Sequence, residues 1–94
     1  MSTALINGVK IGYEVSGSGF PVVLLMGLGG NRKDWHEQVP EFAQHYRTIT
    51  YDHRGTGESD KPEIGYSIDQ FADDCIGLLD HLNLNRAHPV GYSM

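Results

Sequence analysis

Val90-Gly91-Tyr92-Ser93-Met94, the last five residues of the 94-residue chain, match a G-x-S-x-G pattern whose final glycine would be residue 95. In this pattern a strand turns sharply into a helix, and the serine hydroxyl stands exposed at the carboxyl end of the strand. The mostly apolar run 87–90 leads into the turn as a buried strand would. The alternative is a turn serine that bonds only local backbone, and the segments upstream weigh against it.

Two further predicted strands precede this turn, and each ends in a glycine-rich loop. The continuous apolar run Val22–Met26 is typical of a strand covered on both faces, and Gly27-Leu28-Gly29-Gly30 follows it. The segment Arg47–Tyr51 carries alternating β-branched residues into a second loop at 52–59. Both segments therefore predict central strands whose carboxyl ends carry loops.

The remaining elements are a predicted hairpin at the amino terminus and two predicted helices. Segments 4–6 and 9–15 flank Asn7-Gly8, which supplies the positive φ angles of a tight hairpin turn. Apolar residues recur at helical spacing between Trp35 and Tyr46, where Pro40 is tolerable only near the start of a helical turn. Ser67 opens a second helix, with Gln70 completing a capping box. The apolar face expected for that helix comprises Ile68, Phe71, Ala72, Cys75, Ile76, Leu79 and Leu82.

Strands alternating with helices imply parallel crossovers, so the expected class is α/β, a mostly parallel sheet with an N-terminal β-hairpin. Loops at the carboxyl ends of such strands hold any site. No linker or internal repeat divides the sequence, and 94 residues make one domain at most.

The amino-acid composition limits the classes of molecule that the protein is expected to bind. The formal net charge is −5, from 12 acidic and 7 basic residues, which argues against nucleic acid and anionic membrane surfaces and favours a small-molecule substrate. Cys75 is the single cysteine, so no disulfide framework forms within the chain and we expect a buried, inert thiol. The sequence shows neither a signal-peptide pattern nor an apolar run near 18 residues, and we expect a cytoplasmic protein.

Taken together and in this order, segments 26–30, 52–59 and 91–94 resemble the amino-terminal part of an α/β-hydrolase, and the resemblance spans essentially all 94 residues. It implies that 1–94 is an incomplete part of one hydrolase domain, whose remainder would follow Met94. It also implies a cofactor-free serine hydrolase of carboxylic esters, lactones or thioesters. Similar sequences include enol-lactonases, esterases, carbon–carbon bond hydrolases and cofactor-free haloperoxidases, among which these segments do not choose.

The resemblance assigns roles to particular residues. Ser93 would be the nucleophile that forms a covalent acyl-enzyme. The oxyanion hole would consist of the backbone N–H groups of Leu28 and Met94, and Gly27 and Gly91 would permit the supporting turns.

Two positions depart from the family pattern, and one loop has two interpretations. Met26 stands where the family usually has a histidine that braces the loop, which leaves the backbone donor intact. Pro89 stands in a predicted strand, where it must face a gap in the pairing or mark a bulge. In the loop 52–59, Arg54 could face an anionic substrate group. The favoured interpretation is structural: Asp52 and Arg54 pair with one another or cap nearby backbone.

Other sites find less support in the sequence. All five histidines precede Ser93, whereas the acid and the histidine of this family's triad follow the serine, so both stay unassigned. His36-Glu37 begins like a helical zinc motif, but Pro40 occupies the second histidine position, and no metal site is expected. A dinucleotide-binding site would use Gly27, Gly29 and Asp52, but its third glycine position is Arg32.

The main alternative is a non-catalytic fragment, or a ligand-binding, receptor-like relative. A strand ending at Ser93 would lie mid-sheet in this family, so an unpaired edge would recruit the complementary carboxyl-terminal segment or another copy of the chain. A free carboxylate at Met94 would also oppose the developing oxyanion. We therefore expect negligible hydrolysis by residues 1–94 alone.

Overall fold

The computed structural model describes residues 2–26, 32–63 and 66–92. Over these ranges the elements follow the order β1 (Ser2–Ile6), β2 (Val9–Ser16), β3 (Pro21–Met26), the 3-10 helix η1 (Arg32–Trp35), α1 (Val39–Ala43), β4 (Arg47–Tyr51), α2 (Ile68–His81) and β5 (His88–Tyr92). No helix within these ranges combines the length and apolar character needed to cross a membrane.

The amino-terminal hairpin forms as predicted. β1 and β2 pair antiparallel, with Ile6 opposite Val9 across the two-residue turn. Asn7 has φ 49° and Gly8 has φ 84°, the left-handed conformations that a tight primed turn requires and that asparagine and glycine tolerate best. β2 also pairs antiparallel with β4, so the hairpin extends the sheet.

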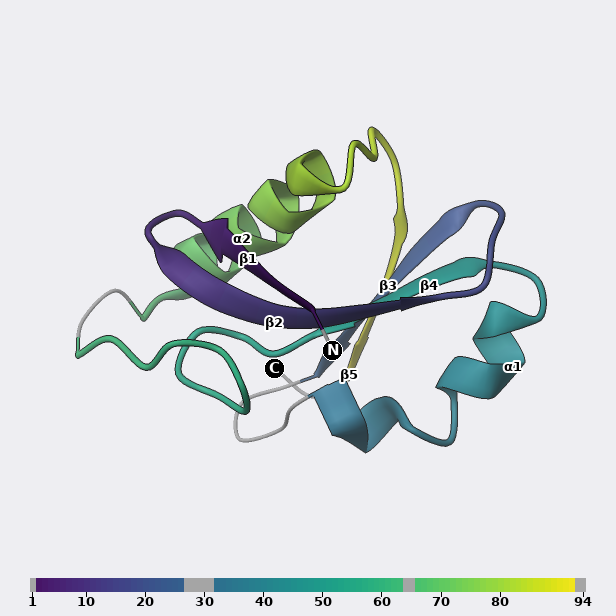
Figure 1. Ribbon diagram of the computed structural model, residues 1–94, viewed down its shortest axis with the longest axis horizontal. Helices are drawn as coiled ribbons and strands as arrows, with labels where there is room; N and C mark the ends of the chain where they lie inside the picture. The colour runs from purple at the N-terminus through teal and green to yellow at the C-terminus, as the bar shows by residue number, and fades with distance from the viewer. Residues whose placement is uncertain (1, 27–31, 64–65, 93–94) are drawn as a thin grey trace.

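The five strands form one mixed sheet in the order β1-β2-β4-β3-β5 (Figure 1). β3 pairs in parallel with β4 on one side and with β5 on the other. The carboxyl ends of these three strands therefore lie at the same edge of the sheet, where the chain continues into 27–31, 52–59 and 93–94. The predicted α/β class with an N-terminal hairpin is confirmed.

β3 is covered on both faces, as its continuous apolar run predicted. Val22 and Leu24 pack with Trp35, Val39 and Phe42 of η1 and α1. Val23, on the opposite face, joins the larger core beneath α2, whose other buried members are Ala4, Ile6, Val9, Ile11, Ile49, Tyr51 and Leu78. Figure 1 shows α2 on one side of the sheet and η1 with α1 on the other.

The first predicted helix is broken into two short pieces. η1 ends at Trp35, and α1 begins at Val39 with Pro40 in its first turn. Proline lacks an N–H and clashes with the preceding turn, so a helix through residues 35–46 cannot be continuous. The periodicity was correct, but the proline restarts the helix.

α2 begins where the sequence predicted, and part of its predicted apolar face is correct. The Ser67 hydroxyl accepts a hydrogen bond from the Gln70 N–H at 3.0 Å, which confirms the Ser67 half of the capping box, while the Gln70 side-chain amide donates to Asp74. Phe71, Asp74 and Leu78 are buried, and Cys75, Leu79 and Leu82 of the predicted face pack against the core. Ile68 and Ile76 are 63% and 58% exposed, and Ala72 is exposed too, so these three members of the predicted apolar face were placed wrongly. The reason is that Asp74 lies on the inward face, where its charge is paired with Arg54. A face predicted from apolar residues alone leaves out an acidic residue.

Pro89 lies in β5, an edge strand of the described sheet. The β3–β5 register runs unbroken from Val22 opposite His88 to Met26 opposite Tyr92, so the bulge alternative is wrong and the unpaired side of β5 fits the other alternative, a gap in the pairing. An outer strand can hold a proline because one side of its backbone has no ladder to supply.

The corrected face of α2 yields a stability prediction. Leu78→Ala should lower the free energy of unfolding by about 2–5 kcal/mol, because it removes a fully buried side chain and leaves a cavity. Ile76→Ala, on the same helix, should change it by less than about 1 kcal/mol. Urea unfolding of both variants of residues 1–94, without the downstream segment, measures the difference. A cost for Ile76→Ala equal to that for Leu78→Ala would restore the face predicted from the sequence.

Candidate active site

Among the predicted site residues the structure describes Gly91, which lies in β5 opposite Leu25 of β3. Gly27, Leu28, Ser93 and Met94 lie outside the described residues. Met26 pairs with Tyr92, so the segments that carry these four residues leave the sheet from adjacent strand ends. A side chain at Gly91 would meet open space, so contacts within the described part do not require glycine there.

A buried carboxylate, Asp52, occupies the carboxyl end of β4 at the same edge. Its side chain is fully buried and accepts hydrogen bonds from two residues of the described part, Arg32 and Glu58. Asp52 Oδ1 accepts from the Arg32 backbone N–H at 2.7 Å, while Oδ2 accepts from Arg32 Nη1 and from the Glu58 N–H, the latter at 2.9 Å. A carboxylate this deep is tolerated because it is paired and its oxygens are bonded.

Arg32 is the residue that sequence reasoning missed. In the sequence, Arg32 stands where a dinucleotide-binding motif would have its third glycine. In the structure its side chain is almost fully buried between Asp52 and Glu14, and the Glu14 carboxylate lies 3.8 Å from Arg32 Nε. Neither motif spacing nor hydrophobic periodicity identifies a buried arginine of this kind. The only indication is chemical: a buried Asp52 carboxylate needs a cation as its partner.

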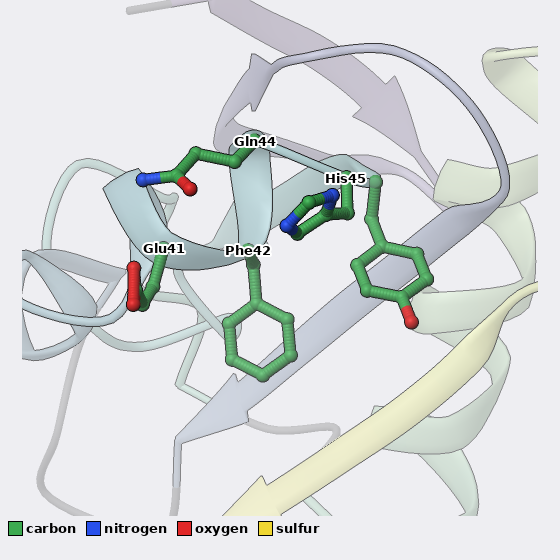
Figure 2. Close-up of a pocket in the computed structure, with 5 residues that line it drawn as sticks. Glu41, Phe42, Gln44 and His45 are labelled. Atoms are coloured by element: carbon green, nitrogen blue, oxygen red, sulfur yellow. The ribbon is translucent and has the colours of Figure 1, made fainter.

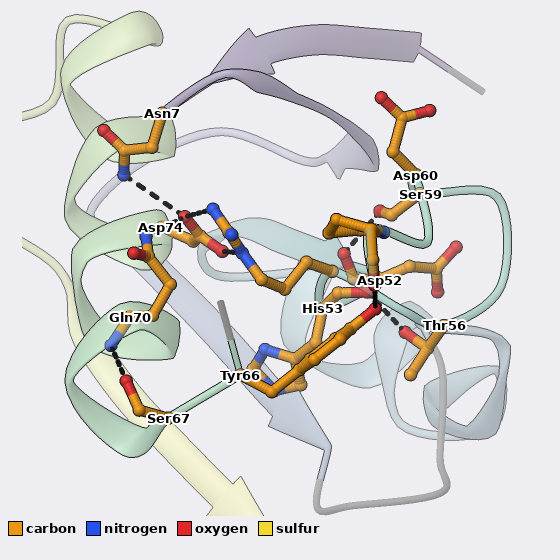
Figure 3. A network of polar contacts seen from close by, with 12 residues as sticks. Asn7, Asp52, His53, Thr56, Ser59, Asp60, Tyr66, Ser67, Gln70 and Asp74 are labelled. Atoms are coloured by element: carbon orange, nitrogen blue, oxygen red, sulfur yellow. Dashed lines mark hydrogen bonds and ion pairs between the residues drawn. The ribbon is translucent and has the colours of Figure 1, made fainter. Parts of the chain in front are cut away.

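A second buried carboxylate, Asp74 of α2, binds Arg54. Arg54 Nε and Nη2 donate to the two Asp74 oxygens at 2.7 and 2.9 Å, a bidentate pair. The same carboxylate accepts from the side-chain amides of Asn7 at 3.2 Å and Gln70 at 3.0 Å. Figure 3 shows Asn7, Gln70 and Asp74 converging from the hairpin turn and α2.

These contacts decide between the two interpretations of the loop 52–59. Asp52 caps backbone, as the structural interpretation predicted, but Asp52 and Arg54 do not pair with one another; each has a partner on another element. Arg54 is 6% exposed, and the hydrogen bond to Asp74 raises its guanidinium pKa further. Arg54 therefore serves the fold and not the recognition of an anionic substrate.

Two glycines make room for this arrangement. Gly55 and Gly57 have φ of 84° and 48°. A Cβ at Gly57 would overlap the Asp52 carboxylate, and one at Gly55 would overlap the Tyr66 ring. Ser59 completes the loop: its hydroxyl accepts from the Gly12 N–H at 2.9 Å and donates to the Asp52 carbonyl at 2.6 Å. The polar groups of Asp52 and Ser59 are thus hydrogen-bonded, as buried polar groups generally are.

The titratable groups beneath this edge do not supply a nucleophile. Burial raises the pKa of the Tyr51 phenol well above its ordinary range, and burial also raises the pKa of the half-buried Cys75 thiol. Both shifts favour the protonated form, but Cys75 is half-buried and not fully buried as we expected. In the described part of the chain, the His, Cys, Asp and Glu side chains form no group of three that could hold a metal ion.

A hollow of about 270 Å³ lies elsewhere, along α1 (Figure 2). Glu41, Phe42, Gln44, His45 and Tyr46 line it. Tyr46 directly precedes β4, so the hollow is near the amino end of that strand, opposite the edge where Ser93 follows β5. It is not part of the candidate active site.

The Arg54–Asp74 pair leads to a second stability prediction. Asp74→Asn should cost about 3–5 kcal/mol of unfolding free energy, because it leaves the buried Arg54 charge without a counterion. The matched control is Asp73→Asn, an exposed neighbour on the same helix, with an expected change within about 0.5 kcal/mol. Denaturant unfolding measures both. Equal effects would mean that the pair contributes nothing to the fold.

The sequence of the chain matches a known protein family. The family model described as the alpha/beta hydrolase fold matches residues 21–94. A soluble epoxide hydrolase of a Corynebacterium species is 35% identical over 95% of the chain and 31% of its own length.

Solved structures of hydrolases have the same fold over nearly the whole chain. The enol-lactonase of Burkholderia xenovorans is 36% identical with a TM-score of 0.93, over 99% of the chain and 37% of its own. An esterase of Exiguobacterium antarcticum is 35% identical with a TM-score of 0.92, over 99% of the chain and 35% of its own. The chain spans about a third of the length of the curated relatives it matches. With a family model matching most of its residues and relatives aligned along nearly all of them, the chain belongs to the α/β-hydrolase family.

Proposed function

We propose that residues 1–94 form the amino-terminal part of a serine hydrolase that cleaves carboxylic esters, lactones or thioesters through an acyl-enzyme at Ser93. The observation that carries this proposal is the end of β5 beside the end of β3, with Tyr92 opposite Met26. Ser93 is the next residue in the sequence. The enol-lactonase and the esterase among its structural neighbours support an acyl substrate.

The proposed chemistry starts with attack of the Ser93 hydroxyl on the acyl carbon while a histidine takes its proton. The N–H groups of Leu28 and Met94 stabilise the oxyanion, the alcohol or thiol leaves with a proton, and water hydrolyses the acyl-enzyme. The acid and the histidine are assigned to a segment downstream of Ser93. The proposal involves no cofactor.

The downstream segment is the partner that we propose for the uncovered parts of the fold. In the described sheet, β5 pairs with β3 on one side and has no strand on the other. Ile68 and Ile76 of α2 expose apolar surface as well. Complementary sequence, supplied by a continuation of the chain, a second polypeptide or a second copy, would pair with that edge and bury that surface. We place the enzyme in the cytoplasm, where a lone reduced cysteine such as Cys75 is stable.

A fluorophosphonate probe tests the nucleophile. The enzyme assembled from residues 1–94 and the downstream segment should bind one probe per site, and Ser93→Ala should abolish the labelling, because the probe reacts with an activated serine. Ser18→Ala, at an exposed serine of the β2–β3 connection, is the matched control and should label normally. Labelling that persists in Ser93→Ala contradicts the assignment. Tight ligand binding by an unlabelled protein would indicate a receptor.

Residues 1–94 alone should not turn over a chromogenic short-chain ester. The physical reason is that Ser93 would lack the general base, which contributes several orders of magnitude to the rate. Adding the downstream segment should restore hydrolysis. Hydrolysis by residues 1–94 alone, abolished in Ser93→Ala, would show that the fragment is self-sufficient.

A further inference from the structure

The Asp52 carboxylate holds two loops together at the edge where Ser93 follows β5. Its donors are the backbone N–H and guanidinium of Arg32, which follows the segment 27–31, and the N–H of Glu58, in the loop after β4. One buried side chain at the end of β4 therefore binds both the chain entering η1 and the loop 52–59.

Asp52 is itself anchored on both sides. Its N–H donates to the Gly12 carbonyl at 2.9 Å, and its carbonyl accepts from the Ser59 hydroxyl at 2.6 Å. Gly57 adds a steric constraint, because any Cβ there would occupy the space of the carboxylate. The side chain thus has a single well-supported position from which it binds Arg32.

Two described points bracket the segment 27–31. Met26 is held by the β3–β5 ladder, and the Arg32 N–H is held by Asp52 Oδ1. Five residues join these points. They include Leu28, whose amide the family resemblance assigns to the oxyanion hole, and the family's bracing histidine is replaced by Met26.

We infer that Asp52 is a positioning residue of the proposed hydrolase. By binding the Arg32 N–H and guanidinium, it fixes the end of the segment that carries the oxyanion-hole amide. This inference rests on the proposed function, because the oxyanion matters only if Ser93 attacks an acyl carbon. Donors to a developing oxyanion must be placed before the reaction, so loosening this anchor affects the transition state more than substrate binding.

The test compares Asp52→Asn with Asp74→Asn in the assembled enzyme. Both residues are fully buried and paired with arginine, but Asp74 lies on α2 and binds Arg54, not Arg32. Asp52→Asn should lower kcat about ten- to hundredfold and change KM less than about threefold. Fluorophosphonate titration gives the number of folded active sites in each sample. Because kcat is divided by that number, partial unfolding of either variant does not lower the measured kcat. Asp74→Asn should keep its kcat per site.

Two further measurements separate positioning from general support of the fold. Arg32→Lys, which keeps the backbone donor and the charge, should retain more of kcat than Asp52→Asn. Hydrogen exchange at the Arg32 amide should be slow in the wild type and faster in Asp52→Asn, because that amide loses its anionic acceptor.

The outcomes distinguish the inference from the proposed function. If wild-type Ser93 is labelled and Asp52→Asn keeps its kcat per site, the positioning role is wrong while the hydrolase assignment stands. An equal fall of kcat per site in Asp74→Asn would likewise reduce Asp52 to general support of the fold. If wild-type Ser93 takes no probe, the proposed function fails and the positioning role of Asp52 fails with it. Slow exchange at the Arg32 amide would then leave Asp52 only a structural anchor.

Discussion

The ion pair between Asp52 and Arg32 is the interaction on which the candidate active-site edge depends. Removing a carboxylate from water costs several kcal/mol unless a cation and further donors replace the water. Asp52 is fully buried, so Arg32 and the Glu58 N–H must stay where they are. That requirement ties the chain after β3 to the chain after β4.

The buried ion pair between Asp74 and Arg54 connects further parts of the fold in the same way. Asp74 brings Arg54 from the loop after β4 and Asn7 from the hairpin turn onto α2. The antiparallel hairpin, the central strands and the helix are thereby joined by one carboxylate as well as by the apolar core. The loop 52–59 resembles a binding loop in its glycines and charges, but the charges of Asp52 and Arg54 make these structural contacts.

The described geometry brings two strand ends together at the edge where we propose the chemistry. β3 and β5 end side by side, and the serine follows the second of them. In the described sheet β5 has no strand on its outer side, and Ile68 and Ile76 of α2 are exposed. These are the surfaces that the proposed complementary segment would cover.

Much of the fold was determined by the sequence alone, because its signals are local. The Asn7-Gly8 turn, the doubly covered β3 and the Ser67 cap each follow from sterics or periodicity within a few residues. The G-x-S turn predicted the nucleophile in the same way, and that prediction lies outside the described residues. Only the tertiary structure decided the partners of Asp52 and Arg54, the inward face of α2 and the unbroken register at Pro89. Each of these depends on groups brought together from distant parts of the chain, 20 residues apart in both ion pairs, and a buried charge selects its partner by proximity in space.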